Sequence, residues 1–249
     1  MVLRTFGLIG YPLSHSFSKK YFSEKFVEQG IAGCEYDLFP LEAITQLPVL
    51  LQEHPQLQGL NVTIPYKVAV LPYINELDEA AAYIGAVNCI SIGQRNGERY
   101  LTGSNTDAYG FEESLKPLLT AGHQKALILG NGGAAKAVKY VLQKLGISFL
   151  SVVRTAAADA ILYEEVNEAL LKEYTVLVNT SPLGMSPNVD TFPAIPYEYL
   201  SEQHLCYDLV YNPAETKFLQ LAKAKGAVIK NGLEMLVLQA ERSWQIWNP

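Results

Sequence analysis

The sequence predicts an α/β protein of two domains, and two observations along its 249 residues lead to this fold class. Segments rich in β-branched and apolar residues alternate with segments whose apolar residues recur at helical spacing, which favours parallel sheets covered by helices. A glycine-rich turn typical of nucleotide-binding domains occurs only near residue 130. The residues before it can form a core of their own. We therefore expect one domain at 1–108 and a second at 109–231.

The first domain is expected to alternate strands and helices before it ends in a hairpin. We expect strands at 5–10, 34–40 and 59–65, helices at 16–30, 41–53 and 77–85, and the hairpin at 86–104. The helix in 16–30 carries apolar residues on one face and ends at a glycine: Phe17, Tyr21, Phe22, Phe26, Val27 and Gly30. Asn96 and Gly97 suit a two-residue hairpin turn, because both positions need a positive φ.

The second domain continues the alternation with different turns. We expect strands at 125–130, 148–153, 175–180, 205–210 and 227–230, and helices at 133–146, 164–173, 214–226 and 233–247. The helix at 233–247 is apolar enough to pack on either domain, and its periodicity leaves both possibilities open.

The composition argues against several classes of partner. The formal net charge of −6 and an isoelectric point near 5.3 give no basic surface for nucleic acid or an anionic membrane. The three cysteines and four histidines show neither C-x-x-C pairs nor metal-ligand spacing, so we expect no disulfide framework and no metal. No apolar run suits a signal peptide or a membrane span, and a cytoplasmic protein is the default expectation.

The turn in "LILGNGGAAKAV" predicts a Rossmann-type, doubly wound dinucleotide-binding domain. Gly130, Gly132 and Ala135 match G-x-G-x-x-G/A, with a strand before the turn and a helix after it. Gly130 would allow the tight turn, Gly132 would let a diphosphate approach the backbone, and the helix N-terminus would bind it. A glycine-rich turn that binds nothing is the alternative. We place Gly130, Asn131, Gly132, Gly133 and Ala134 at the cofactor.

The end of the next strand indicates which dinucleotide binds. NAD sites use an acidic residue at this point for the ribose hydroxyls. Here Arg154 and Thr155 follow the strand, and the first acidic residue beyond them is Asp159. A guanidinium binds phosphate through paired hydrogen bonds, so NADP, with its 2′-phosphate, fits better. A solvated surface arginine is the alternative.

Polar residues interrupt the strands and helix starts of the first domain. "NVTIPYK" carries Asn61, Thr63 and Lys67 through an apolar, strand-like run, where each would cost free energy without a partner. Ser14 and Ser16 precede a helix, Asn88 lies in a strand, and Asp107 precedes another helix. Each serine, and Asp107, could simply be an N-cap. Together these side chains suit a polyhydroxy acid bound at the carboxyl ends of the strands.

Seven motifs, in this order, resemble those of shikimate dehydrogenases: "GYPLSHSFS", "NVTIPYK", "GAVN", "SNTDAYGF", "GNGGAAKAV", "NTSPLGM" and "NGLEMLVLQA". The likeness extends from Gly7 to Gln239, and "NVTIPYK" combined with "NTD" is its most specific part. The resemblance implies NADPH-dependent reduction of 3-dehydroshikimate to shikimate in aromatic amino-acid biosynthesis. It also implies a substrate domain that the C-terminal helix at 232–249 completes, with a Rossmann domain between.

The resemblance also implies roles for individual residues. Lys67 and Asp107 would be catalytic, and the substrate would contact Ser14, Ser16, Asn61, Thr63, Asn88, Tyr211 and Gln239. The cofactor would contact the turn at 130–134, Arg154, Thr155, Asn179, Thr180, Met185 and Gly232. The chain departs from the family pattern at Val153 and at the alanines 156–158, where the family often has asparagine and another basic residue. It also has Glu234 where a glycine is usual.

The expected chemistry accounts for the lysine in "NVTIPYK". Negative charge builds on a ketone oxygen as hydride arrives, and the Lys67 ammonium can stabilise that charge and deliver a proton. Desolvation would lower the pKa of Lys67, whereas the charge of Asp107 would oppose this shift. Three alternatives stay open: a quinate/shikimate or related cyclic polyol-acid dehydrogenase, a non-catalytic ligand sensor, and a plain Rossmann-type binding module. A monomer and a homodimer are both compatible with the sequence.

Overall fold

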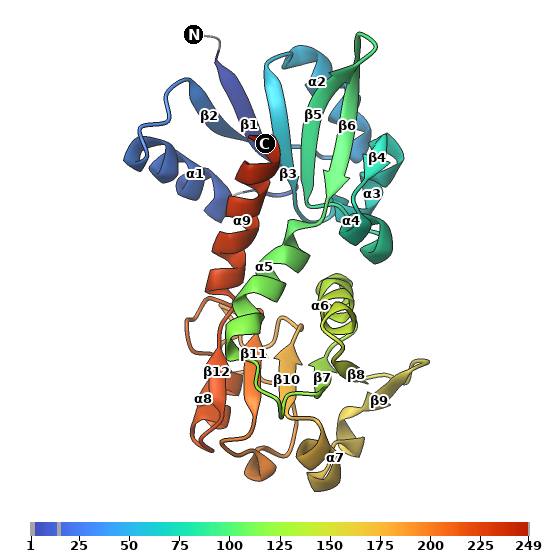
Figure 1. Cartoon of the computed structure of the whole chain (residues 1–249), viewed down its shortest axis with the longest axis vertical. Helices are drawn as coiled ribbons and strands as arrows, with labels where there is room; N and C mark the ends of the chain where they lie inside the picture. The colour runs from blue at the N-terminus through green and yellow to red at the C-terminus, as the bar shows by residue number, and fades with distance from the viewer. Residues whose placement is uncertain (1–2, 14–15, 249) are drawn as a thin grey trace. The chain divides into compact units, whose positions relative to one another are not determined.

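The computed structural model describes residues 3–13 and 16–248, which form two compact units (Figure 1). Unit 1 comprises Met1–Thr106 and Ala240–Pro249, and unit 2 comprises Asp107–Gln239. Both units are α/β, as the sequence predicts. No helix in the described part of the chain has the length and apolar character needed to cross a membrane.

Within the described residues, unit 1 contains one six-stranded sheet in the order β2-β1-β3-β5-β6-β4. Its strands are β1 (Arg4–Gly10), β2 (Cys34–Pro40), β3 (Leu57–Val62), β4 (Glu76–Leu77), β5 (Cys89–Arg95) and β6 (Glu98–Ser104). Strand β1 pairs parallel with β2 and β3, whereas β5 pairs antiparallel with β3 and β6, so the sheet is mixed. The predicted hairpin is confirmed: Arg95 pairs with Glu98, and Asn96 and Gly97 have φ values of 56° and 83°.

Helices cover both faces of this sheet. Alternate residues of a strand point to opposite sides, so apolar side chains on both faces pack against helices. The helical elements are α1 (Phe17–Glu28), η1 (Ile44–Gln46), α2 (Leu47–Glu53), α3 (Tyr66–Ala69), η2 (Leu71–Tyr73) and α4 (Glu79–Ile84). Phe6 and Leu8 pack with α1 and the end of the C-terminal helix, and Ile9 packs with α2 and α3.

The sequence pattern is wrong about one residue of the expected apolar face of α1. Val27 is 82% exposed, whereas Phe22 and Phe26 are buried as expected. Lys25 is buried instead, three residues after Phe22, and its ammonium lies 2.7 Å from the Glu241 carboxylate. A charged side chain can occupy that position because this ion pair and its hydrogen bonds offset the loss of hydration.

The segment "NVTIPYK" is not a strand over its whole length. Strand β3 ends at Val62, and the Tyr66 N–H then donates to the Thr63 carbonyl, which closes a turn. Pro65 has no N–H for a ladder and ends strand pairing here. Lys67 therefore lies in the short helix α3, not at a strand end as predicted.

The two tryptophans of the chain lie in the C-terminal helix α9 (Leu233–Trp247) and pack into unit 1. The Trp247 ring stacks on Phe6 with centroids 4.9 Å apart, and its indole N–H donates to the Ile90 carbonyl at 3.0 Å. Gly59 in β3 lies beneath the same ring, where a Cβ would overlap the indole. The absence of a side chain at Gly59 thus lets α9 lie close to the sheet.

Replacing Gly59 with alanine is expected to destabilise unit 1 by about 1–3 kcal/mol, because the Trp247 ring must move from a close-packed site. Urea unfolding followed by tryptophan fluorescence measures this loss, since both tryptophans lie in the C-terminal helix. Gly93→Ala in β5 is the matched control, because a Cβ there has its nearest described neighbour at 3.9 Å. Equal midpoints for the two variants would contradict the packing argument.

Unit 2 contains a second sheet, whose six strands among the described residues are all parallel. They are β7 (Lys125–Leu129), β8 (Ser148–Val153), β9 (Ala160–Leu162), β10 (Val176–Asn179), β11 (Leu205–Asp208) and β12 (Val228–Lys230). Their order, β12-β11-β10-β7-β8-β9, is that of a doubly wound Rossmann sheet. Strand β9 is not predicted by the sequence pattern, because it is three residues long and only half-buried.

The helical elements of unit 2 begin with α5 (Thr106–Leu115), whose first residue belongs to unit 1. The others are η3 (Lys116–Leu118), α6 (Gly133–Lys144), η4 (Tyr163–Glu165), α7 (Glu168–Glu173), η5 (Tyr197–Tyr199) and α8 (Lys217–Lys223). Residues 233–239 of α9 also belong to unit 2, whereas the family resemblance implies that the whole helix completes the first domain. Gly110 lacks a side chain and lies against the Met235 carbonyl, which ties this end of α9 to α5.

Candidate active site

The glycine-rich turn lies where a Rossmann sheet binds its ligand. The strand order reverses between β7 and β10, and the turn after Leu129 begins at the carboxyl end of β7. Gly130 has φ +122°, and a Cβ there would lie 2.7 Å from the Thr180 hydroxyl at the end of β10. Only glycine satisfies both conditions.

The rest of the turn leads directly into α6. Gly132 is the N-cap, and the helix begins at Gly133. A Cβ added at Gly132 or Gly133 would meet no described atom within 4 Å, so a ligand can approach the backbone there. Ala135 is fully buried and lets α6 pack against the sheet. The first N–H groups of α6 form the kind of anion site that the sequence predicts for a diphosphate.

Arg154 and Thr155 follow directly after β8, and both are exposed. Burial raises the pKa of Tyr163, and the positive charge of Arg154 opposes this rise. The alanines 156–158 supply no second cation beside Arg154. A 2′-phosphate at this strand end would therefore have Arg154 as its principal charge partner in the loop.

Asn179, at the end of β10, is fully buried, and its amide is used within the protein. Its Nδ2 donates to Asp208 Oδ1 at 3.0 Å and to the Leu183 carbonyl, and its Oδ1 accepts from the backbone and hydroxyl of Ser181. Asn179 therefore shapes the loop that follows β10. Met185, which the sequence predicts to contact the cofactor, lies in this loop and is exposed.

Asp208 joins three segments at the carboxyl end of β11. Besides the Asn179 amide, it accepts from the Val210 N–H at 3.0 Å and from the Thr216 hydroxyl at 2.6 Å. Thr216 is the N-cap of α8. Burial raises the pKa of the Asp208 carboxyl to about 6, because desolvation outweighs the three hydrogen bonds, which favour the charged form.

We expect unit 2 to lose stability as the pH rises through the pKa of Asp208. The folded pKa, about 6, lies above the ordinary value of 3.8, so the native state binds more protons than the unfolded state between these values. The stabilising effect of protonation is complete below pH 3.8 and is lost above pH 6. Its full size is about 3 kcal/mol at 1.36 kcal/mol per pKa unit.

Thermal unfolding of Asp208→Asn between pH 4 and pH 8, followed by circular dichroism, measures this effect. The isosteric amide keeps its acceptor toward Val210, so the variant should show a flatter dependence of Tm on pH than the wild type. Glu198→Gln, which changes an exposed carboxylate, is the control. Parallel curves for wild type and Asp208→Asn would exclude Asp208 as the titrating group.

In unit 1, Asn61 and Asn88 are buried and belong to one hydrogen-bonded network. Asn61 Nδ2 donates to the Asn88 carbonyl at 3.2 Å and to Ser243 Oγ at 2.8 Å, and its Oδ1 accepts from the Tyr36 hydroxyl at 2.8 Å. Asn88 Oδ1 accepts from the Thr106 N–H at 2.6 Å, and Asn88 Nδ2 donates to Thr106 Oγ1 at 2.9 Å. The polar groups therefore have partners, as their burial requires.

Ser16 is the N-cap residue of α1, yet its side chain makes no capping bond. Its hydroxyl oxygen is buried and has no hydrogen-bond partner among the described residues. The N-cap alternative thus explains the position of Ser16 but not the state of its hydroxyl. A buried hydroxyl ordinarily has a hydrogen-bond partner, so this oxygen is a position at which a ligand atom could bind. Ser14 lies outside the described residues.

Two predicted residues lie close to the end of β3. Thr63 is half-buried, and its methyl group packs against Gly10. Lys67 is half-buried in α3, and its carbonyl accepts from the Val87 N–H at 2.7 Å. Strand β3, helix α3 and the segment before β5 are thereby held together around "NVTIPYK".

The other predicted site residues belong to unit 2. Asp107 lies in the first turn of α5, after Thr106, so it is not an N-cap. Gln239 in α9 is buried, Tyr211 is 41% exposed, and Gly232 packs too closely against the Leu209 carbonyl to carry a side chain. Glu234, in the first turn of α9, forms an ion pair with Lys230 at the end of β12.

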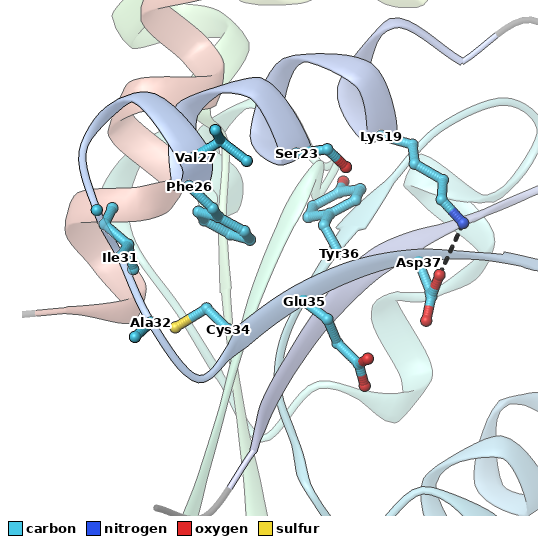
Figure 2. Close-up of a pocket in the computed structure, with 11 residues that line it drawn as sticks. Lys19, Ser23, Phe26, Val27, Ile31, Ala32, Cys34, Glu35, Tyr36 and Asp37 are labelled. Atoms are coloured by element: carbon cyan, nitrogen blue, oxygen red, sulfur yellow. Dashed lines mark hydrogen bonds and ion pairs between the residues drawn. The ribbon is translucent and has the colours of Figure 1, made fainter.

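A pocket of about 620 Å³ lies between α1 and β2 in unit 1, and Figure 2 shows the residues that line it. Lys19 and Asp37 form a 2.8 Å ion pair at its rim, and Tyr36 forms part of its wall. Of the described residues that line it, none was predicted to bind substrate or cofactor.

The sequence pattern missed four residues that organise the site: Tyr36, Thr106, Asp208 and Ser243. Asp208 could have been suspected, because an acidic residue ends the apolar strand "LCYD". Ser243 carries no comparable signal, since a serine in an amphipathic helix is ordinarily a surface residue.

Unit 2 thus has the sheet order, glycine turn and polar strand ends of a Rossmann-type dehydrogenase, and unit 1 carries a second set of polar side chains. The comparisons with known proteins agree with this class. Residues 8–90 match the model of the shikimate dehydrogenase substrate binding domain. The shikimate dehydrogenase (NADP(+)) of Carboxydothermus hydrogenoformans is 38% identical over 97% of this chain and 90% of its own.

Solved structures show the same likeness. The shikimate 5-dehydrogenase of Thermus thermophilus, in complex with NADP(H) and shikimate, aligns with a TM-score of 0.83 at 31% identity over 99% of this chain and 94% of its own. The 5-ketofructose reductase of Gluconobacter sp. strain CHM43 aligns with a TM-score of 0.84 at 27% identity over 99% and 93%. The chain belongs to the shikimate dehydrogenase family, which confirms the resemblance and the fold class predicted from its motifs.

Proposed function

We propose that this protein catalyses the reversible, NADPH-dependent reduction of 3-dehydroshikimate to shikimate in aromatic amino-acid biosynthesis. The observation that carries this proposal is the near-full-length similarity to NADP-dependent shikimate dehydrogenases, which includes both units. Family membership confirms the prediction of an NADP-dependent dehydrogenase. The buried Ser16 hydroxyl, which has no hydrogen-bond partner among the described residues, and the open backbone of the glycine turn are features that fit a substrate and a dinucleotide.

Bound NADPH supplies the hydride that reduces the ketone carbon. Lys67 holds its ammonium beside the ketone oxygen, stabilises the negative charge that develops there and gives up a proton to form the hydroxyl. Asp107 orients that ammonium and accepts a hydrogen bond from a substrate hydroxyl. The position of Lys67 on α3, which Tyr66 anchors through a 2.6 Å bond to the Leu41 carbonyl, supports a fixed location for the amine.

The substrate carboxylate is held by Ser14 and Ser16, whose hydroxyls precede α1. The hydroxyl groups of the substrate bond to Asn61, Thr63, Asn88, Gln239 and Tyr211. The buried Ser16 hydroxyl supports this orientation, because it lacks a partner within residues 3–13 and 16–248 and a carboxylate would accept its hydrogen bond.

The dinucleotide binds along the carboxyl ends of the unit 2 strands. The turn at 130–134 holds the diphosphate, while Arg154 and Thr155 bind the 2′-phosphate. Thr180, Met185 and Gly232 border the nicotinamide end, and Asn179 maintains the loop that carries Met185. The strand order of unit 2 supports this arrangement.

An absorbance assay tests the proposal directly. NADP⁺ reduction is measured at 340 nm with shikimate as the hydride donor. The assay is repeated with quinate and with the reduced form of 5-ketofructose as donors, and with NAD⁺ in place of NADP⁺. Shikimate with NADP⁺ should give the highest kcat/KM. A higher value with quinate would favour the broader dehydrogenase, whereas saturable binding of both ligands without turnover would indicate a sensor.

We also propose that the protein acts on small molecules in the cytoplasm as a monomer or a homodimer, without nucleic-acid or membrane partners. The acidic composition supports the absence of such partners. Sedimentation velocity of the purified chain distinguishes monomer from dimer.

A further inference from the structure

A fully buried serine of the C-terminal helix connects the segments that lead to the two proposed catalytic residues. Ser243 Oγ, in α9, accepts from Asn61 Nδ2 at 2.8 Å and lies 3.3 Å from Thr106 Oγ1. Asn61 is on β3, two residues before Thr63 and six before Lys67. Thr106 immediately precedes Asp107.

The rest of the network fixes the same two segments from other directions. The Tyr36 hydroxyl donates to Asn61 Oδ1, so both ends of the Asn61 amide are bound and the group cannot rotate without losing a bond. Asn88 binds both the backbone and the hydroxyl of Thr106. Tyr36, Asn61, Asn88, Thr106 and Ser243 are each at most 5% exposed.

This burial makes the network stiff. Breaking a bond here leaves a buried polar group without water to replace its partner, which is unfavourable. The Ser243 hydroxyl, which contacts both segments, therefore restricts the movement of β3 and of the start of α5 more than a surface contact would. In this arrangement, both N–H groups of Asn61 are used within the protein.

We propose that Ser243 is a positioning residue for catalysis, with Asn61 and Tyr36 as its partners. It connects Asn61 of β3 to Thr106. It therefore fixes the two segments that lead to Lys67 and to Asp107. This role rests on the proposed dehydrogenase function. The C-terminal helix thus contributes to catalysis through a residue that touches neither substrate nor cofactor.

The test is steady-state kinetics of Ser243→Ala with shikimate and NADP⁺, well below its unfolding temperature. We expect kcat to fall about tenfold, which corresponds to about 1.4 kcal/mol of barrier. The KM for NADP⁺ should stay unchanged, because Ser243 lies in unit 1 and the cofactor residues lie in unit 2. Tyr36→Phe, which removes only the hydroxyl on Asn61, should lower kcat in the same direction and keeps the ring stacked on Phe22.

Two comparisons separate positioning from a merely structural role. Ser114→Ala is the matched control: Ser114 is a buried helical serine bonded to the Gly110 carbonyl and the Tyr207 hydroxyl, and its loss should lower stability but leave kcat unchanged. In a Lys67→Ala background, the further effect of Ser243→Ala on kcat should largely disappear, because residues that act as a unit are not additive.

The inference fails on its own terms if active wild-type enzyme is obtained and Ser243→Ala keeps kcat within twofold. It also fails if Ser243→Ala lowers kcat by the same factor with and without Lys67. Lack of wild-type turnover with shikimate would instead overturn the proposed function.

Discussion

Lys67→Ala is expected to lower kcat for shikimate oxidation by about 10²–10⁴-fold while the KM for shikimate changes little. The ammonium acts on charge that is present mainly in the transition state, so its removal affects the chemical step more than binding. The side chain is half-buried on α3, where bonds from Tyr66 and Val87 fix the backbone on both sides. Truncation should therefore leave the local fold intact.

Initial rates over a range of shikimate concentrations separate the two parameters. Lys172→Ala, which removes an exposed lysine from an ion pair with Glu168 in α7, is the control and should behave as wild type. A kcat near that of wild type together with a higher KM would mean that Lys67 only binds substrate.

For Arg154→Ala, we expect the ratio of kcat/KM with NADPH to that with NADH to fall about 10- to 100-fold. A hydrogen bond to a charged group contributes about 1.5–3 kcal/mol, and a guanidinium offers two to a phosphate. Because Arg154 is exposed, solvent screening reduces the pair to about the value of one such bond. The effect should be large here, because the neighbouring alanines 156–158 provide no cation that could substitute.

Measuring both cofactors on the same variant separates loss of phosphate recognition from general damage. The efficiency with NADH, which has no 2′-phosphate, should stay close to that of wild type. Arg95→Ala, in the hairpin of unit 1, removes an exposed guanidinium that contacts Tyr100 and serves as the control. An unchanged ratio in Arg154→Ala would refute the assignment of Arg154 to the phosphate.

The elements that the sequence pattern predicts well have strong local signals. The helix α6 follows from periodic apolar residues after a glycine turn, and the hairpin follows from Asn96-Gly97. The pattern fails where a tertiary contact decides. Val27 is exposed and Lys25 is buried, because Glu241 of a distant helix supplies a partner for the ammonium. Strand β9 is missed because three half-buried residues carry too little periodicity.

The sequence by itself determined the fold class, the nucleotide turn and the family motifs. These depend on residue types at fixed spacings within short segments, where glycine φ angles and apolar periodicity act locally. Only the tertiary structure decided how the polar residues are partnered. Asn61, Thr106 and Ser243 are separated by up to 182 residues along the chain, yet hydrogen bonds connect them in unit 1. Which hydroxyl satisfies which buried amide depends on the packing of whole helices and strands, and no local pattern encodes it.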